Sequence, residues 1–141
     1  MKSSKAHYED MLWYLAGPMS GIDKFNIPAF MQTKASMEAK GYIVHLPADL
    51  DDPQAVTDLL EADGQAYRDK TWSQYLADDI ILIGDKCDGV AVMPKWYDSR
   101  GACLETFTAA LCNKPIVYAQ TMDTVSPIAL MDAWSQWVYP Q

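Results

Sequence analysis

The sequence predicts an α/β protein of three layers, in which helices cover both faces of a parallel sheet of about four to five strands. Short apolar segments alternate along the chain with segments whose apolar residues recur at helical spacing. The apolar segments are continuous instead of alternating with polar residues, which is typical of strands buried on both faces. At 141 residues, the chain is expected to form one domain, residues 1–141.

Four apolar segments are predicted to be strands: residues 12–16 (LWYLA), 42–46 (YIVHL), 89–93 (GVAVM) and 116–118 (IVY). Right-handed crossovers between parallel strands bring the carboxyl ends of these strands to one edge of the sheet. The segments that follow the strands are therefore expected to line one cleft at that edge: residues 17–21, 47–49, 96–101 and the loop after 118.

Four helices are predicted between the strands and after them: residues 26–41, 72–83, 101–113 and 126–138, with a further short helix near 55–62. Asn26 is the expected N-cap of the first helix, and Gly41 is expected to end it. Helical spacing predicts buried stripes on two of these helices: Trp72, Leu76, Ile80 and Ile83, and then Leu104, Phe107 and Leu111. The polar residues 1–10 are expected to be frayed.

The composition argues against several classes of partner. A net charge of −8 disfavours binding to nucleic acid or to an anionic membrane surface. The chain shows no apolar segment of transmembrane length and no signal-peptide pattern. Its three cysteines are odd in number and lack zinc spacing, which indicates reduced thiols in a cytoplasmic protein. We expect no metal and no cofactor.

The segment 87–105 (CDGVAVMPKWYDSRGACLE) is the strongest candidate for a functional site. It reads as a buried strand, a loop and the start of a helix, which is where α/β proteins hold anionic ligands. Ser99, Arg100 and Gly101 stand at the expected helix start, and Glu105 follows in about the first turn. A carboxylate would then lie beside a captured anion. The glycine-rich loop 17–21 is either part of the same cleft or a plain strand-to-helix turn.

Three motifs resemble the nucleoside 2-deoxyribosyltransferase-like family, and most closely its small, often phage-borne or prophage-borne branch of unknown function. They are YLAGPMSG at 14–21, W-x-x-Y-L-x-x-D-I at 72–80 followed by Cys-Asp at 87–88, and WYDSRGACLE at 96–105. The ordered set spans residues 12–118. The resemblance implies a Rossmann-like fold and cleavage of an N-glycosidic bond.

The resemblance also implies roles for individual residues. Glu105 matches the family's nucleophile, and Asp79 matches the assisting aspartate, although the spacing to Asp88 leaves Asp78 as an alternative. Ser99 and Gly101 match the residues that hold the 5′-phosphate in the monophosphate hydrolases of the family. Two residues of the first strand and its loop match the sugar site: Tyr14 and Gly17. Tyr14 is expected to act with Glu105 and Asp79 as a catalytic residue. Further substrate-binding residues are expected in the same loops: Met19, Ser20, Trp96, Asp98 and Arg100.

The chemistry expected from this set is hydrolysis of a nucleoside 5′-monophosphate, or its deoxy form, to free base and sugar phosphate. An ionised Glu105, favoured by the helix start, would attack the anomeric carbon, and a second, protonated carboxyl group would protonate the leaving base. Trp96, Tyr97 or Met19 would stack on the base, unless Trp96 only packs.

Two other functions stay open from the sequence: transfer of a deoxyribosyl group to a second base, and nucleotide binding or sequestration without catalysis. The apolar helix expected at 126–138 is predicted to pack on the domain or on another subunit. The family that the chain resembles commonly builds its sites at subunit contacts. The apolar helix and this resemblance together predict a homodimer or homotetramer.

Overall fold

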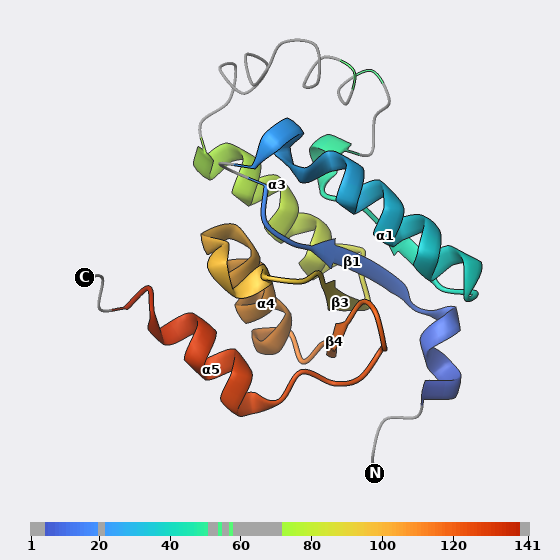
Figure 1. Ribbon diagram of the computed structural model, residues 1–141. Helices are drawn as coiled ribbons and strands as arrows, with labels where there is room; N and C mark the ends of the chain where they lie inside the picture. The colour runs from blue at the N-terminus through green and yellow to red at the C-terminus, as the bar shows by residue number, and fades with distance from the viewer. Residues whose placement is uncertain (1–4, 20–21, 51–53, 55–56, 58–71, 139–141) are drawn as a thin grey trace.

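The computed structural model describes residues 5–19, 22–50, 54, 57 and 72–138 (Figure 1). The predicted short helix at 55–62 lies almost wholly outside the described residues, and Ser20 does as well. The strands are β1 Leu12–Ala16, β2 Ile43–His45, β3 Gly89–Val92 and β4 Ile116–Tyr118. The α-helices are α1 Ile27–Ala39, α3 Trp72–Asp85, α4 Arg100–Leu111 and α5 Pro127–Ser135.

The four strands form one parallel sheet in the order β2-β1-β3-β4, which confirms the predicted fold class. Tyr14 in β1 lies between His45 of β2 and Val90 of β3. Since every pair is parallel, the strands all end at the same edge. The sheet order places β1 and β3 at its centre, and the connections from these two strands lead in opposite directions. Ligands bind at this kind of switch point in open α/β sheets.

The alternation of side chains along β1 divides the core into two layers. Trp13 and Leu15 pack with Phe30 on the face covered by α1. Tyr14 and Ala16 face the opposite layer, which contains buried residues of α3, α4 and α5 (Figure 1). A side chain of β1 therefore reaches α4 only from an even-numbered position.

The start of α1 differs from the sequence prediction. Asn26 precedes the helix, but its side chain makes no capping hydrogen bond. Its amide nitrogen Nδ2 instead donates to the carbonyl oxygen of Pro18 at 2.9 Å. Asn26 can do this because Lys24, Phe25 and Asn26 all adopt left-handed backbone conformations, which turn its side chain toward the loop after β1. The other end is as predicted, since Gly41 follows the helix with φ of +98°.

The predicted buried stripe of α4 is wrong. Leu104, Phe107 and Leu111 are 38%, 42% and 69% exposed. The buried face carries smaller or polar residues: Ala102, Cys103, Glu105, Thr106 and Ala109. Small side chains allow α4 to approach the sheet closely, so the helix presents its large apolar residues to the outside. The stripe of α3 is confirmed at Ile83, which is fully buried, while Leu76 and Ile80 are half-buried.

Both ends of the described chain pack onto the domain. Residues Lys5–Asp10 form a 3-10 helix, so the expected fraying of 1–10 is wrong for this part. Tyr8 is buried against Trp13, and its carbonyl oxygen accepts a hydrogen bond from Trp13 Nε1 at 2.9 Å. At the other end, Leu130 and Ala133 of α5 are buried, as predicted for an apolar tail helix. None of the helices that the structure describes is long and apolar enough to cross a membrane.

Candidate active site

Tyr14 and Glu105 meet in the layer between β1 and α4. The Tyr14 hydroxyl donates a hydrogen bond to Glu105 Oε2 at 2.6 Å. Tyr14 is fully buried, and Glu105 is 6% exposed. Tyr14 occupies an even-numbered position of β1, and Glu105 lies on the inner face of α4, so the fold directs the two side chains toward each other.

Asp79 of α3 is the third member of this cluster. Its carboxyl group interacts with both Tyr14 and Glu105 by hydrogen bonding and by charge. Its Oδ1 atom also accepts a hydrogen bond from the backbone N–H of Ala48 at 2.9 Å, in the 3-10 turn that follows β2. The structure therefore brings together the three residues predicted to be catalytic, and it selects Asp79 over Asp78.

Burial controls the protonation of the cluster. The pKa of Glu105 is raised well above its usual range, first by burial and then by the charge of Asp79 and the hydrogen bond to it. The hydrogen bond from Tyr14 acts in the opposite direction. The pKa of Tyr14 is itself raised, first by burial and then by the charge of Glu105. Glu105 therefore keeps its proton to a higher pH than an exposed carboxyl group does.

This result corrects the prediction that the helix start ionises Glu105. The helix begins at Arg100, so Glu105 lies in its second turn, where the effect of the dipole has largely decayed. The desolvation of the buried charge is the larger effect. The position also excludes the simpler interpretation of Glu105 as an exposed carboxylate at a helix start.

The loop before α4 has the geometry of an anion site. Ser99 is the N-cap of the helix, and its Oγ accepts a hydrogen bond from the backbone N–H of Ala102 at 3.1 Å. The hydroxyl proton of Ser99 remains available for donation to a ligand. Within the described part of the chain, the backbone N–H groups of Arg100 and Gly101 make no hydrogen bond. A side chain at Gly101 would meet little beyond Ser99 Oγ, 3.8 Å from an ideal Cβ, so there is space beside these donors.

A comparison with known families matches residues 11–118 to a domain of unknown function, DUF4406. This range covers most of the chain, from β1 to β4, and includes Tyr14, Asp79 and Glu105. The chain belongs to the DUF4406 family. No curated protein and no solved structure matches it.

The remaining predicted site residues of this DUF4406 domain do not all join the cluster. Arg100 lies over Trp137, with its guanidinium carbon 5.4 Å from the ring centre. Asp98 is exposed in the 3-10 turn Trp96–Asp98. Trp96 is 4% exposed and belongs to the core on the α4 side, so it packs and is not free to stack on a base. Its neighbour Tyr97 is exposed and can fill that role.

Gly17 and Met19 lie toward the other face of the sheet. Gly17 is buried against Met93, whose sulfur would be 2.8 Å from a Cβ at position 17. This close approach of the ends of β1 and β3 explains the glycine. Met19 packs against the core on the α1 side. Neither residue is close to Glu105 by these contacts, although Gly17 follows Tyr14 by only three residues.

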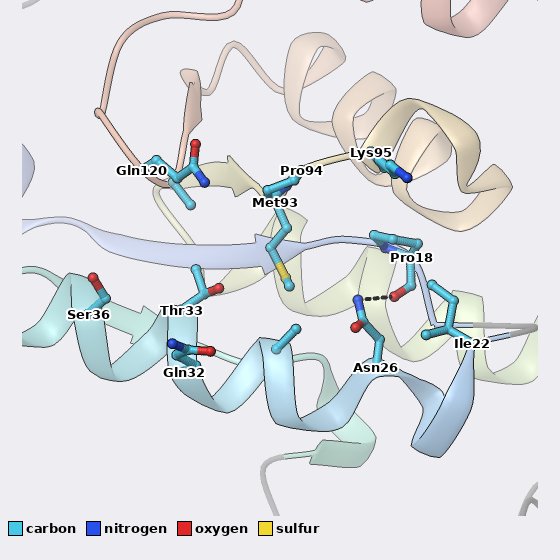
Figure 2. Close-up of a pocket in the computed structure, with 12 residues that line it drawn as sticks. Pro18, Ile22, Asn26, Gln32, Thr33, Ser36, Met93, Pro94, Lys95 and Gln120 are labelled. Carbon is cyan, nitrogen blue, oxygen red and sulfur yellow. Dashed lines mark hydrogen bonds between the residues drawn. The ribbon is translucent and has the colours of Figure 1, made fainter.

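A second hollow of about 500 Å³ lies on the α1 face of the DUF4406 domain. Figure 2 shows Gln32, Thr33 and Ser36 of α1 on one side of it, with Met93 and Gln120 on the other side and Asn26, which precedes α1, beside Pro18. It opens at the same edge of the sheet, but the described residues that line it include no member of the Tyr14–Asp79–Glu105 cluster.

Sequence reasoning missed one residue that shapes the cluster, Ala48. Its contribution is a backbone N–H, which no side-chain pattern can reveal, although the loop 47–49 was expected at this edge. Among the described residues, no group of three or more His, Cys, Asp or Glu side chains is arranged to hold a metal ion.

Proposed function

We propose that this DUF4406 domain hydrolyses the N-glycosidic bond of a nucleoside 5′-monophosphate, ribo or deoxy, and releases free base and sugar 5-phosphate. The observation that supports it is the cluster of Tyr14, Asp79 and Glu105, in which the half-buried Asp79 interacts with the buried Tyr14–Glu105 pair. A pair of carboxyl groups is the usual apparatus for cleaving a bond at an anomeric carbon. A protein that only binds nucleotides has no need of one.

A proton shared by Glu105 and Asp79 would give each carboxyl group its own role in the reaction. In the reaction, Glu105 attacks the anomeric carbon as a carboxylate, while the proton resides on Asp79 and is transferred to the departing base. The bond from sugar to base breaks as an ester bond from Glu105 to the sugar forms, and water then hydrolyses the ester with Asp79 as the base. Tyr14 donates to one oxygen of Glu105 and so stabilises its ionised form. The other oxygen is left for the sugar.

The start of α4 supports a phosphorylated substrate over a bare nucleoside. The Ser99 hydroxyl and the N–H groups of Arg100 and Gly101 are donors at the positive end of a helix dipole. Glu105 lies about one helical turn beyond Gly101, on the inner face. A phosphate held at this end of the helix would place the ribose over its first turns. No observation favours transfer to a second base over hydrolysis by water.

We place this activity in the cytoplasm. Cys87, Cys103 and Cys112 are all free, and the first two are buried. Burial raises the pKa of Cys87 to about 11, so this thiol is protonated and unreactive at neutral pH. Free cysteines are the ordinary state in a reducing compartment.

The experiment that tests the proposal is incubation of the purified protein with a panel of nucleosides and their 5′-monophosphates, with released base measured by chromatography. Base release from at least one monophosphate, faster than from its nucleoside, is expected. Two substitutions of neighbouring aspartates form a matched pair. Asp79→Asn is expected to slow release by roughly 10²–10⁴-fold, the usual contribution of a general acid, while Asp78→Asn has little effect.

The result against catalysis would be the absence of base release from every member of the panel, together with nucleotide binding detected by calorimetry. That outcome would indicate a protein that binds nucleotides without cleaving them. Equal slowing by Asp78→Asn and Asp79→Asn would remove the specific role given to Asp79.

A further inference from the structure

The outer face of α4 has the composition of a buried surface. From Gly101 to Asn113 the only charged residue is Glu105, which points inward. The residues turned outward are Leu104, Phe107 and Leu111, at spacings of three and four. A helix that faces water for its whole length normally carries charged residues on that side. This face of α4 does not.

The face continues onto α5. The rings of Phe107 and Trp134 are in edge-to-face contact, with centroids 5.0 Å apart. The two helices are antiparallel, since Gln136 bonds the Tyr97 carbonyl and the Cys103 thiol lies near the Ala133 carbonyl. One turn from the ring contact, toward the end of α4, Leu111 on α4 therefore lies near Met131 on α5. Met131 and Ile128, on the same side of α5, are 63% and 74% exposed.

We infer that this surface, formed by Leu104, Phe107, Leu111, Ile128 and Met131 and named here the α4–α5 face, is the interface of a homodimer. Five large side chains that are roughly half exposed leave several hundred Å² of apolar surface uncovered. That is comparable to the largest patch on a typical monomer, about 300–600 Å², and such a patch often serves in binding. A standard interface takes about 800 Å² from each partner, so the face with its rim has the required size.

The charge of the chain favours a second copy at this face over contact elsewhere. Each copy carries a net charge of −8, so two copies repel one another through most of their surfaces. Two exposed charged residues lie within its two helices, Arg100 at the first position of α4 and Asp132 of α5, and neither belongs to the five residues of the face. A twofold axis through the face places apolar residues of one copy against the same set in the other. The α4–α5 face is therefore the surface through which the homodimer or homotetramer expected from the sequence would form.

The interface would also fix the position of the helix that carries the site. Leu104 and Glu105 are neighbours on α4 and point in different directions, Leu104 toward the α4–α5 face and Glu105 toward Tyr14. Burial of the outer face would hold α4 between the partner and the sheet. This inference does not depend on the proposed hydrolysis, because the apolar face is present whatever the cluster catalyses.

Sedimentation equilibrium of the full chain tests the inference, with Leu111→Glu and Met131→Glu as separate variants. Both positions are more than half exposed in the single copy, so the substitutions leave folding intact, which thermal melting checks. The native chain is expected at twice 15.8 kDa at micromolar concentration, and each variant at 15.8 kDa. The substituted residue occurs twice in a symmetric interface, so the dissociation constant should rise about a hundredfold or more.

The matched control is Met31→Glu, which places the same charge at an exposed apolar residue of α1, on the opposite face of the sheet. This variant should remain dimeric. A native chain that stays monomeric up to a hundred micromolar overturns the inference. So does a dimer that persists in both α4–α5 variants, or one that Met31→Glu disrupts to the same degree.

Discussion

The substitution Glu105→Gln is expected to make the protein less active and, above acidic pH, more stable. Glutamine preserves the size of the side chain. Its amide oxygen can accept the hydrogen bond from Tyr14, and its amide nitrogen can donate to Asp79, which becomes an ordinary carboxylate held by the Ala48 N–H. The packing of the buried cluster is therefore retained, while the carboxyl group that must keep a proton is removed.

The size of the effect depends on pH in a defined direction. The pKa of Glu105 is raised in the folded state from its ordinary value of 4.5, so the folded protein holds a proton that the unfolded chain releases. Below about pH 4.5 both states are protonated, and this contribution to stability is fully present. It is lost as the pH rises from there to the folded-state pKa, at about 1.4 kcal/mol per pH unit for one proton. Glutamine does not titrate, so the free energy of unfolding of Glu105→Gln does not contain this pH-dependent decrease.

Urea denaturation at a series of pH values from 5 to 8 measures the difference. The free energy of unfolding of the native chain should fall relative to that of Glu105→Gln as the pH rises, with a slope that approaches 1.4 kcal/mol per unit. Glu38→Gln is the control, since Glu38 is an exposed glutamate of α1 paired with Lys34. Parallel curves for the native chain and Glu105→Gln would show that Glu105 is ionised in the folded protein, and would refute the assignment of a shared proton.

Three further predictions concern the same structure. Tyr14→Phe removes the hydrogen bond that lowers the pKa of Glu105, so the rising limb of the pH–rate profile should move to higher pH; an unmoved limb would separate Tyr14 from the ionisation of Glu105. Lys114→Met should lower the free energy of unfolding by about 2 kcal/mol, measured by urea denaturation, because its Nζ donates to the carbonyls of Ile83, Gly84 and Cys87 at the end of α3. Gly89→Ala should lower the free energy of unfolding by about 1–3 kcal/mol in the same assay, because the added Cβ would lie 2.4 Å from the buried ring of Trp13. Gly84→Ala is the control: its Cβ would have no atom within 4 Å, so this substitution should leave the free energy of unfolding unchanged or raise it.

The sequence predicted most of the framework. The strands 12–16 and 116–118 have the predicted bounds, and the other two begin or end within one residue of them. Such agreement is expected where a continuous apolar segment is buried on both faces, because burial and local propensity then favour the same conformation. The end of α1 was predictable for a similar reason, since Gly41 adopts a positive φ that suits glycine.

The sequence was misleading where large side chains were taken to define the inside. The stripe Leu104, Phe107 and Leu111 has perfect helical spacing, yet the helix turns its small residues inward. Periodicity identifies the faces of a helix, but the space available above the sheet decides which face fits against it. For α4 that space suits Ala102, Cys103 and Ala109. The structural role of Tyr8 was missed for a different reason: the residues around it are polar, and its burial depends on the ring of Trp13.

For the candidate site, the sequence determined which residue types are present and in what order, and the tertiary structure decided which of them touch. Residues 14, 79 and 105 are far apart along the chain, and only the parallel order of β1 and β3 beneath α3 and α4 brings their side chains into one buried cluster. The sequence could not choose between Asp78 and Asp79, because adjacent residues differ by about 100° around a helix and the rotation of α3 is fixed by packing. Nor could it show that the pKa of Glu105 is raised, because the pKa of a carboxyl group follows from its burial and its neighbours.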